Sequence, residues 1–377
     1  MFWNLMPKEN ISFEERTNLS QFILNTDRYT QGVYVKQFEA DWSEWQQCKY
    51  SVFVNSGSSA NLLLVKSMYD LYGAGGMLCQ ACTWPTNINP AIQLKESNFL
   101  QLCDNSLSNF GFNTDHFKDY VNRLKPKYAF LTHILGFNGA TNELLKICEE
   151  NKIKIIEDCC ESHGANFNGI KVGNIGMAGT FSFYYGHHMT TIEGGMISTN
   201  NEELYHQLLL NRSHGLLREH PNKENIETNC DRRFTFLTDG FNFRNTEIHA
   251  YLGMMQLKKL DNNILIRNKN YEYFISNLDN TKYETAFDSN GISSFALPII
   301  SKNNNIKKLV TQLTDAGIEN RPFIAGNLFN QPYLQKVNMY NNFPNADYIH
   351  NNGLYVGNNQ FVEYNMIDKL LNILNND

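Results

Sequence analysis

The sequence lacks the long apolar run of a membrane-spanning helix, because no stretch approaches about 18 apolar residues. It also lacks a secretory leader, since the first residues, MFWNLMPKENISFEER, contain no basic start followed by an apolar segment. We find no internal repeat and no low-complexity tract. These absences predict a cytoplasmic protein that has no membrane partner.

Strong positive charge is absent as well. The chain has 32 Lys and Arg residues against 38 Asp and Glu residues, for a net charge of −6, without a basic block or an RNA-reading aromatic motif. We therefore expect no nucleic-acid partner. Hydrophobic residues make up 42% of the chain and aromatic residues 13%, which is enough for sizeable cores and excludes wholesale disorder.

The eight cysteines do not follow the spacing of a disulfide framework and lie mostly inside apolar runs. We expect reduced, mostly buried thiols. Cys79 and Cys82 form a lone C-x-x-C pair. Without a second pair or histidine ligands the pair is weak evidence for zinc or iron, so we expect no metal site.

Strand and helix signals alternate over the first two thirds of the chain. The pattern predicts strands at 50–55, 127–135, 154–157 and 179–185, and helices at 60–72 and 142–151. Such alternation is typical of a mostly parallel sheet with helices on both faces, an α/β fold. Ligands of such a sheet gather at the carboxyl ends of the strands.

The length of 377 residues favours about two domains. We expect a large domain over 1–260 with an N-terminal arm, and a small C-terminal α/β domain over 261–377. The elements expected near this boundary and beyond it are helices at 245–260, 260–276, 306–316 and 363–374 and a strand at 294–300. A polar, charged segment at 216–234 is too long for a tight connection and predicts a mobile active-site flap.

Small residues and one acid mark two strand ends. Asn55-Ser56-Gly57-Ser58-Ser59-Ala60-Asn61 stands between a strand and a helix, where free N–H groups and the helix dipole can hold a phosphate. The same residues also make ordinary turns and helix caps. Asp158 closes an apolar strand, where its carboxylate can keep a pyridine nitrogen protonated or simply cap a helix. Trp84 can stack on a flat ring or pack in the core.

One segment is far more specific. It runs Gly179-Thr180-Phe181-Ser182-Phe183-Tyr184-Tyr185-Gly186-His187-His188-Met189-Thr190-Thr191-Ile192-Glu193-Gly194-Gly195-Met196. It resembles the active-site segment of the DegT/DnrJ/EryC1/StrS sugar aminotransferases, where serine-phenylalanine is followed by three residues, a lysine, and a Thr-rich stretch that ends in Glu-Gly-Gly. Counting from either end of the pattern places His187 at the lysine.

The resemblance extends from residues 32–39 to residues 353–358 and implies the aspartate-aminotransferase-like fold of type I pyridoxal 5′-phosphate enzymes. It implies that a set of residues binds this cofactor: the amides of Gly57 and Ser58 and the Ser182 hydroxyl at the phosphate, Trp84 on the ring, Asp158 at the ring nitrogen, and Glu161 beside the 3-oxygen. It further implies a homodimer in which the loop 240–244 places Asn242 at the phosphate of the neighbouring subunit.

The departure at His187 points to the reaction. A lysine amine bonds covalently to the cofactor aldehyde, whereas an imidazole cannot form that stable bond but can move protons near neutral pH. Histidine at this place, with the Glu-Ser pair after Asp158-Cys159-Cys160, resembles the 3-dehydratases of the family. These use pyridoxamine 5′-phosphate, regenerated from L-glutamate, and release ammonia. The implied substrate is a nucleotide-linked 4-keto-6-deoxy sugar, best matched by GDP-4-keto-6-deoxy-D-mannose.

Several alternatives stay open at this point. An iron–sulfur branch of the family, which acts on CDP-linked sugars, needs a cysteine group after Glu-Gly-Gly, but Met196 stands there and only Cys230 follows. An ordinary aminotransferase would need another lysine, and a non-catalytic cofactor-binding regulator would have little reason to keep Asp158, Glu161 and Ser182 together. His214, Arg218 and Arg321 are candidates for contact with the sugar or its diphosphate, although surface histidines and arginines are commonly only solvated.

Overall fold

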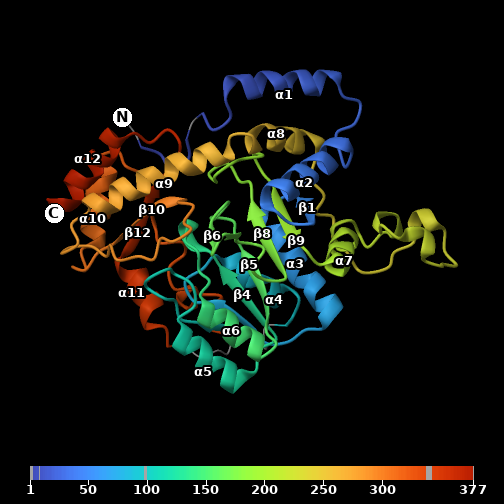
Figure 1. Ribbon diagram of the computed structural model, residues 1–377, viewed down its shortest axis with the longest axis horizontal. Coiled ribbons are helices and arrows are strands. Elements are labelled where there is room, and N and C mark those ends of the chain that lie inside the picture. Colours follow the sequence, from blue (N-terminus) through green and yellow to red (C-terminus); the bar gives the residue numbers. More distant parts are fainter. Residues whose placement is uncertain (1–2, 8, 97–99, 337–341, 377) are drawn as a thin grey trace.

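A computed structural model describes residues 3–7, 9–96, 100–336 and 342–376 (Figure 1). Its centre is a seven-stranded sheet of order β1-β9-β8-β5-β4-β2-β3. These strands are β1 (Tyr50–Val54), β2 (Met77–Gln80), β3 (Leu100–Cys103), β4 (Tyr128–Thr132), β5 (Lys154–Asp158), β8 (Ala178–Ser182) and β9 (Gly195–Thr199). β9 runs antiparallel to its neighbours β1 and β8, and the other pairs are parallel. The predicted mostly parallel sheet is confirmed.

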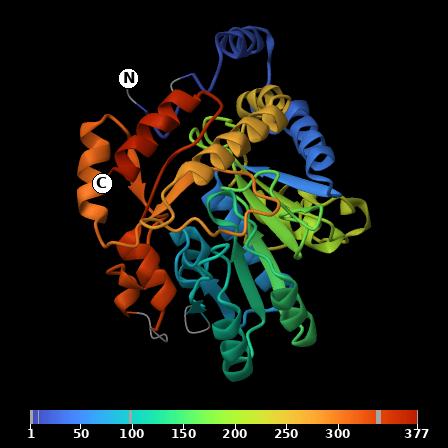
Figure 2. The same cartoon turned by 60° about the vertical axis from the view of Figure 1, so that its left-hand side comes forward.

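Helices cover both faces of this sheet (Figures 1 and 2). The helices of this part are α2 (Val33–Gln46), α3 (Gly57–Tyr72), α4 (Asn89–Gln93), α5 (Thr114–Leu124), α6 (Asn142–Glu150), α7 (Glu202–Arg212) and α8 (Glu247–Leu257). Alternate strand residues face opposite layers: Val52 and Val54 pack in the cluster with α3 and α7, whereas Phe53 packs in the cluster with α2. Because helices cover both faces, nearly every residue of these strands is buried, the polar ones included.

Short polar side chains cap most of these helices. Ser56 caps α3, Thr141 caps α6 and Thr246 caps α8, each accepting a backbone N–H of the first turn. The helix α1 (Phe13–Asn25), which lies over α8 in Figure 1, begins with a reciprocal Ser12 and Glu15 capping box.

A second, three-stranded antiparallel sheet lies towards the C-terminus, with the order β10-β12-β11. The elements of this part are α9 (Leu260–Asn277), β10 (Ala296–Ile300), α10 (Ile306–Asp315), β11 (Asn320–Pro322), α11 (Pro344–Asn352), β12 (Gly353–Gly357) and α12 (Tyr364–Asn375), and a small hairpin, β6 (Asn166–Phe167) and β7 (Ile170–Lys171), stands between β5 and β8. Trp3 pairs with Ile318, and its indole N–H donates to the Gly357 carbonyl (2.9 Å). The N-terminal residues therefore pack against this second sheet, and the domain boundary at 260/261 stays a prediction.

Two predicted strands end earlier than the sequence pattern indicates. The strand expected to run to residue 135 stops at Thr132, because Leu135 takes a left-handed conformation (φ 52°) within a 3-10 turn, η3 (Ile134–Gly136). That turn directs the Leu135 N–H to the carboxylate of Glu161 (2.9 Å). The strand expected to run to residue 185 stops at Ser182, whose hydroxyl accepts the N–H of Tyr184 (3.3 Å).

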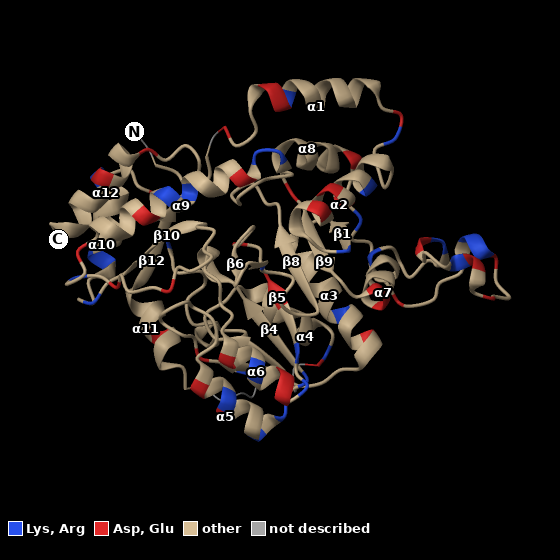
Figure 3. Ribbon diagram, viewed as in Figure 1, with Lys and Arg blue, Asp and Glu red and all other residues tan. Residues whose placement is uncertain are grey.

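The segment 216–234 leaves the body of the molecule next to α7 (Figure 1). It contains three 3-10 helices, η4 (Leu217–Glu219), η5 (Lys223–Asn225) and η6 (Arg232–Phe234), and carries charges of both signs (Figure 3). Its irregular course matches the expectation, and its mobility stays a prediction. In the described part of the chain, no helix combines the length and the apolar character needed to cross a bilayer.

The thiols are unpaired, and most of them are buried. Cys79 and Cys82 lie fully inside the protein, where burial raises the pKa of both thiols. His133, Glu157 and Cys159 also lie close together, but Glu157 accepts the N–H groups of Gly173, Ile175 and Gly176 and bonds to His133. These contacts account for the buried carboxylate of Glu157 as a structural link between β5 and the turn at 173–176.

Candidate active site

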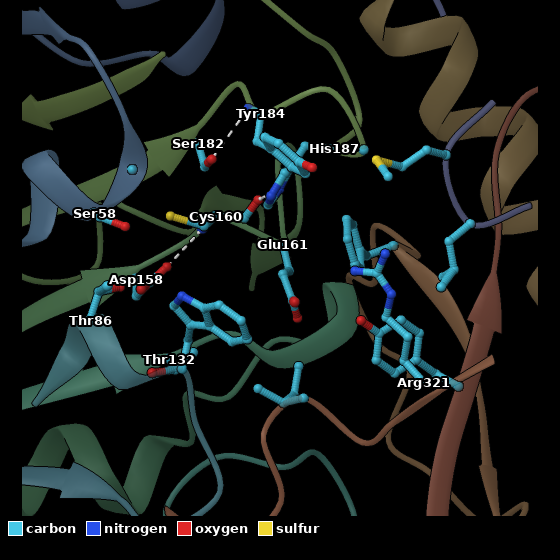
Figure 4. Close-up of a pocket in the computed structure, with 18 of the residues that line it drawn as sticks. Ser58, Thr86, Thr132, Asp158, Cys160, Glu161, Ser182, Tyr184, His187 and Arg321 are labelled. Carbon is cyan, nitrogen blue, oxygen red and sulfur yellow. Dashed lines mark hydrogen bonds between the residues drawn. The ribbon is translucent and has the colours of Figure 1, made fainter. Parts of the chain in front are cut away.

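A cavity opens at the carboxyl ends of β5 and β8 and at the start of α3 (Figure 4). Eight of the predicted site residues line it: Gly57, Ser58, Trp84, Asp158, Glu161, Ser182, His187 and Arg321. The fold thus brings together residues that are up to 264 positions apart in the chain, from Gly57 to Arg321. His214, Arg218 and Asn242 do not line this cavity.

The start of α3 leaves two backbone N–H groups facing the cavity. The Ser56 side chain takes the N–H of Ser59 (3.0 Å), and the first-turn N–H groups of Gly57 and Ser58 have no partner inside the helix. A Cβ on Gly57 would lie 2.7 Å from the Cβ of Ser182, so only glycine permits this close approach. Two free amides, a helix N-terminus and the Ser182 hydroxyl suit a phosphate group.

Three donors hold the Asp158 carboxylate. Its Oδ2 accepts one amide N–H from Asn61 and one from Asn87, each at 2.8 Å, and its Oδ1 accepts the backbone N–H of Cys160 (2.9 Å). The amide oxygens of Asn61 and Asn87 accept the hydroxyls of Thr180 (2.6 Å) and Thr83 (3.0 Å), which fixes the orientation of both amides.

Asp158 is therefore a rigidly held acceptor at the end of β5. The helix-cap alternative does not apply, because α6 precedes the strand and a turn follows it. The sequence did not mark Asn61 and Asn87 as functional candidates, although Asn61 ends the segment 55–61 and Asn87 lies three positions after Trp84. Their role is visible only in the folded structure, where both amides donate to the carboxylate of Asp158.

Trp84 stands at the wall of the cavity and remains 53% exposed. The alternative of a core tryptophan is wrong, because core rings of this size in the protein, such as Trp42, are fully buried. An exposed flat ring beside a phosphate cradle suits stacking on an aromatic ligand.

Glu161 lies deeper in the cavity. Its Oε2 accepts the N–H of Leu135 (2.9 Å), and removal from solvent raises the pKa of its carboxyl to about 8, with a further rise from nearby Asp158. At neutral pH the group carries a proton, so it can donate an O–H hydrogen bond to an oxygen of a bound ligand.

His187 faces the cavity, and its tautomer follows from one contact. Nδ1 lies 2.5 Å from the carbonyl oxygen of Cys160, which can only accept, so Nδ1 carries the hydrogen and Nε2 holds the free lone pair. Desolvation lowers the pKa of His187 to about 4, against smaller rises from the Cys160 bond and from Asp158. The imidazole is thus uncharged at neutral pH and ready to accept a proton at Nε2.

His188 points elsewhere. It is fully buried, and its Nε2 donates to the Ser293 carbonyl (3.1 Å). Only His187 of the adjacent histidine pair therefore lines the cavity. No lysine lines the cavity among the residues that the structure describes.

Further residues of the cavity wall were not predicted from the sequence. Leu5 and Met6 come from the N-terminus, and Phe295 and Tyr355 come from the second sheet region. The Leu5 N–H donates to Glu319 (2.9 Å), whose other oxygen lies 3.4 Å from Arg321. No local pattern marks these residues, because only tertiary packing carries them to the cavity.

The three predicted residues outside the cavity are all exposed. Asn242 accepts a hydrogen bond from Arg244 (3.1 Å) and pairs by its backbone with Ser213. Arg218 lies 3.5 Å from Glu219, and His214 has a left-handed backbone (φ 62°). Their predicted roles stay predictions.

The chain matches the model of the DegT/DnrJ/EryC1/StrS aminotransferase family over residues 10–374. It is 34% identical over 372 residues to the GDP-4-keto-6-deoxy-D-mannose 3-dehydratase of Escherichia coli O55:H7, covering 94% of this chain and 95% of that protein. The enzyme of the same name from Yersinia pseudotuberculosis is also 34% identical, covering 96% of this chain and 95% of that protein.

Solved structures agree with these matches. The structure of the E. coli GDP-4-keto-6-deoxy-D-mannose 3-dehydratase with bound hydrated PLP superimposes with a TM-score of 0.91 at 32% identity, covering 99% of this chain and 100% of that chain. The Helicobacter pylori aminotransferase PseC has a TM-score of 0.84 at 18% identity, covering 100% of this chain and 97% of that chain, which shows a shared fold. The type I pyridoxal phosphate fold expected from the sequence is confirmed.

Proposed function

The chain belongs to the DegT/DnrJ/EryC1/StrS aminotransferase family, and from this premise we propose that it is a pyridoxal-phosphate-dependent 3-dehydratase. The proposed substrate is a nucleotide-linked 4-keto-6-deoxy sugar, GDP-4-keto-6-deoxy-D-mannose, from which the enzyme removes the C3 hydroxyl. The observation that carries the proposal is His187, an uncharged imidazole at the lysine position in a cavity that no described lysine lines.

The residues present fit the cofactor. The amides of Gly57 and Ser58 and the Ser182 hydroxyl would hold the phosphate, Trp84 would stack on the ring, and Asp158 would pair with the ring nitrogen. Glu161 would donate its proton to the 3-oxygen. When bound in its aminated form, this cofactor supplies an amine for the C4 ketone and a ring that withdraws electrons.

The chain itself then has one proton to move. Nε2 of His187 would take this proton from the methylene carbon that bears the cofactor's amine, while Nδ1 stays bonded to the Cys160 carbonyl and keeps the ring oriented. Nε2 would then give the proton to the C3 hydroxyl, which would leave with its bonding electrons as water. L-Glutamate supplies the amine of each turnover, and 2-oxoglutarate and ammonia are released with the 3-deoxy-4-keto sugar.

Two copies of the chain are proposed to form the active unit. Asn242 is exposed and lies outside the cavity of its own chain, so it is available to the phosphate of a second copy. His214 and Arg218, exposed in the same part of the chain, are proposed to contact the sugar or its diphosphate, as is Arg321 from within the cavity.

The test is an incubation of the purified protein with pyridoxal phosphate, glutamate and a panel of GDP- and CDP-linked 4-keto sugars, with products identified by mass and NMR. The expected product is the 3-deoxy-4-keto sugar on GDP, with 2-oxoglutarate and ammonia in equal amounts. A 4-amino sugar that keeps its C3 hydroxyl would establish an aminotransferase instead. Cofactor binding without turnover of any sugar would favour a regulator.

A further inference from the structure

Behind the cavity, α9 buries one arginine completely. Arg267 is 1% exposed, and its guanidinium has no carboxylate within ion-pair distance in the part of the chain that the structure describes. Buried charges in proteins are normally paired, because removal from water strongly disfavours an isolated ion. Burial lowers the pKa of Arg267 to about 9, which still leaves a cation at neutral pH.

The guanidinium is held by backbone carbonyls of three separate segments. It donates to the carbonyl of Phe295 (3.1 Å) before β10, to that of Asn358 after β12, and to that of His187 (3.3 Å). The Phe295 ring in turn contacts the imidazole of His187, with ring centroids 5.2 Å apart. The planar guanidinium fork of Arg267 thus fixes the backbone of His187 and the backbone of Phe295, whose ring lies beside the imidazole.

The charge of this fork also acts on the imidazole. The titratable groups around His187 come from every element packed near it: Asp158 at the end of β5, Cys160 and Glu161 after it, His163, Tyr184 and His188 on the connecting loops, Arg267 on α9, and Arg321 and Tyr355 across the cavity. Beyond burial, the Cys160 bond and Asp158 raise the pKa of His187, and Arg267 lowers it. His163 and His188 have their own pKa values lowered by burial and by Arg267.

We propose that Arg267 is a positioning residue for His187: its guanidinium fixes the backbone of the base and places a buried positive charge next to it. An imidazolium beside a buried cation gives up its proton more readily, which favours delivery of that proton to the leaving hydroxyl. This catalytic consequence rests on the proposed function, whereas the coupling between the two side chains does not.

The coupling is measured by NMR titration of the purified protein, with and without pyridoxal phosphate, using isotope-labelled histidine. His187→Asn identifies the His187 resonance. Arg267→Met removes the charge but keeps an unbranched chain of similar length, and Arg267→Lys keeps the charge but loses the fork. Lys269→Met, on the exposed face of the same helix, is the matched control for the loss of one charge.

In Arg267→Met the titration midpoint of His187 should rise by about half a pH unit to one pH unit, whereas in Lys269→Met it should stay within a few tenths of a unit. In Arg267→Lys it should stay within about half a unit of the wild type. An unchanged midpoint in folded Arg267→Met, or an equal rise in Lys269→Met, overturns the proposal. If Arg267→Met does not fold, a rise above about half a unit in Arg267→Lys overturns it.

The sugar assay separates this outcome from the proposed function. If the wild type dehydrates the sugar, the acid limb of its pH–rate profile should move upward in Arg267→Met by the same amount as the NMR midpoint. If the wild type does not dehydrate the sugar but the NMR midpoint still moves, the proposed function fails and the coupling stands.

Discussion

The cavity floor, which we define by Asp158, Ser182 and His187, and the projecting segment 216–234 next to α7 hold their polar residues in different ways. On the floor, Asp158 has three donors and His187 has a carbonyl partner, and these contacts join separate elements of the sheet. Arg218 in the projecting segment and Asn242 on the nearby loop 240–244 are exposed, and their side chains contact residues one or two positions away. The floor is therefore organised within one chain, whereas these exposed residues gain a defined role only from something added to the chain.

The largest effect is expected when His187, the base on the cavity floor, is replaced. His187→Asn keeps a polar side chain but cannot cycle a proton, so dehydration should fall by about 10²- to 10⁴-fold. Cofactor affinity, measured by absorbance titration, should change little because the phosphate cradle, Trp84 and Asp158 are untouched.

His188→Asn is the neighbouring control. Its imidazole is bonded to Ser293 away from the cavity, so the variant should lose some thermal stability but keep most of the rate. Wild-type turnover by His187→Asn would refute the assignment of the base. His187→Lys should divert the reaction towards a 4-amino sugar.

The floor could be predicted from the sequence because its residues follow strand ends in short, contiguous motifs. Asp158 closes β5, and Ser182 and His187 fall within one segment whose spacing identifies the family. Part of the wall could not be predicted in this way. Leu5 and Tyr355 reach the wall, and Arg267 the layer behind it, through packing of the N-terminus and the second sheet region on the first sheet, and nothing in their local sequence encodes that approach.

Strand ends were the weakest part of the fold prediction. An apolar run such as residues 127–135 continues past the strand because the following turn is buried as well. Leu135 leaves the strand to satisfy the carboxylate of Glu161, a partner that is 26 residues away. Hydrophobicity alone cannot distinguish these two buried conformations.

The buried carboxyl group of Glu161 should make the unfolding free energy of the protein depend on pH. The pKa of Glu161 is about 8 in the folded protein and about 4.5 when unfolded, so the native state binds more protons between these values and loses stability as pH rises through this window. Glu161→Gln cannot ionise, so the cofactor-free variant should match the wild type near pH 5. By about pH 9 it should be more stable by roughly 2 to 4 kcal/mol.

Urea unfolding of the cofactor-free protein across this range measures the difference. Glu149→Gln, on the exposed face of α6, is the control and should follow the wild type at every pH. If the stability difference between Glu161→Gln and the wild type is constant with pH, Glu161 does not titrate in this window.

Mixed dimers test whether Asn242 on the loop 240–244 serves a second copy of the chain. If Asn242 completes the site of a partner, a dimer of one His187→Asn chain and one Asn242→Ala chain contains one intact site, because the base and the amide come from opposite chains. Its turnover should be about half that of the wild-type dimer, well above either variant homodimer. Differently tagged chains, purified in two steps, provide the sample. Turnover no higher than the mean of the two homodimers would place both residues in one site of the same chain.

The smallest expected effect concerns Trp84, which stands in the wall of the cavity. Its ring is 53% exposed, so Trp84→Ala removes little packing and should change the unfolding free energy of the cofactor-free protein by less than about 0.5 kcal/mol. Loss of ring stacking should still weaken cofactor binding by about three- to tenfold. Trp84→Phe keeps a flat ring and should recover most of that affinity. Absorbance titration for affinity and urea unfolding for stability separate the two quantities. Equal losses of both in Trp84→Ala, unrelieved in Trp84→Phe, would mean that the indole supports the protein rather than the ligand.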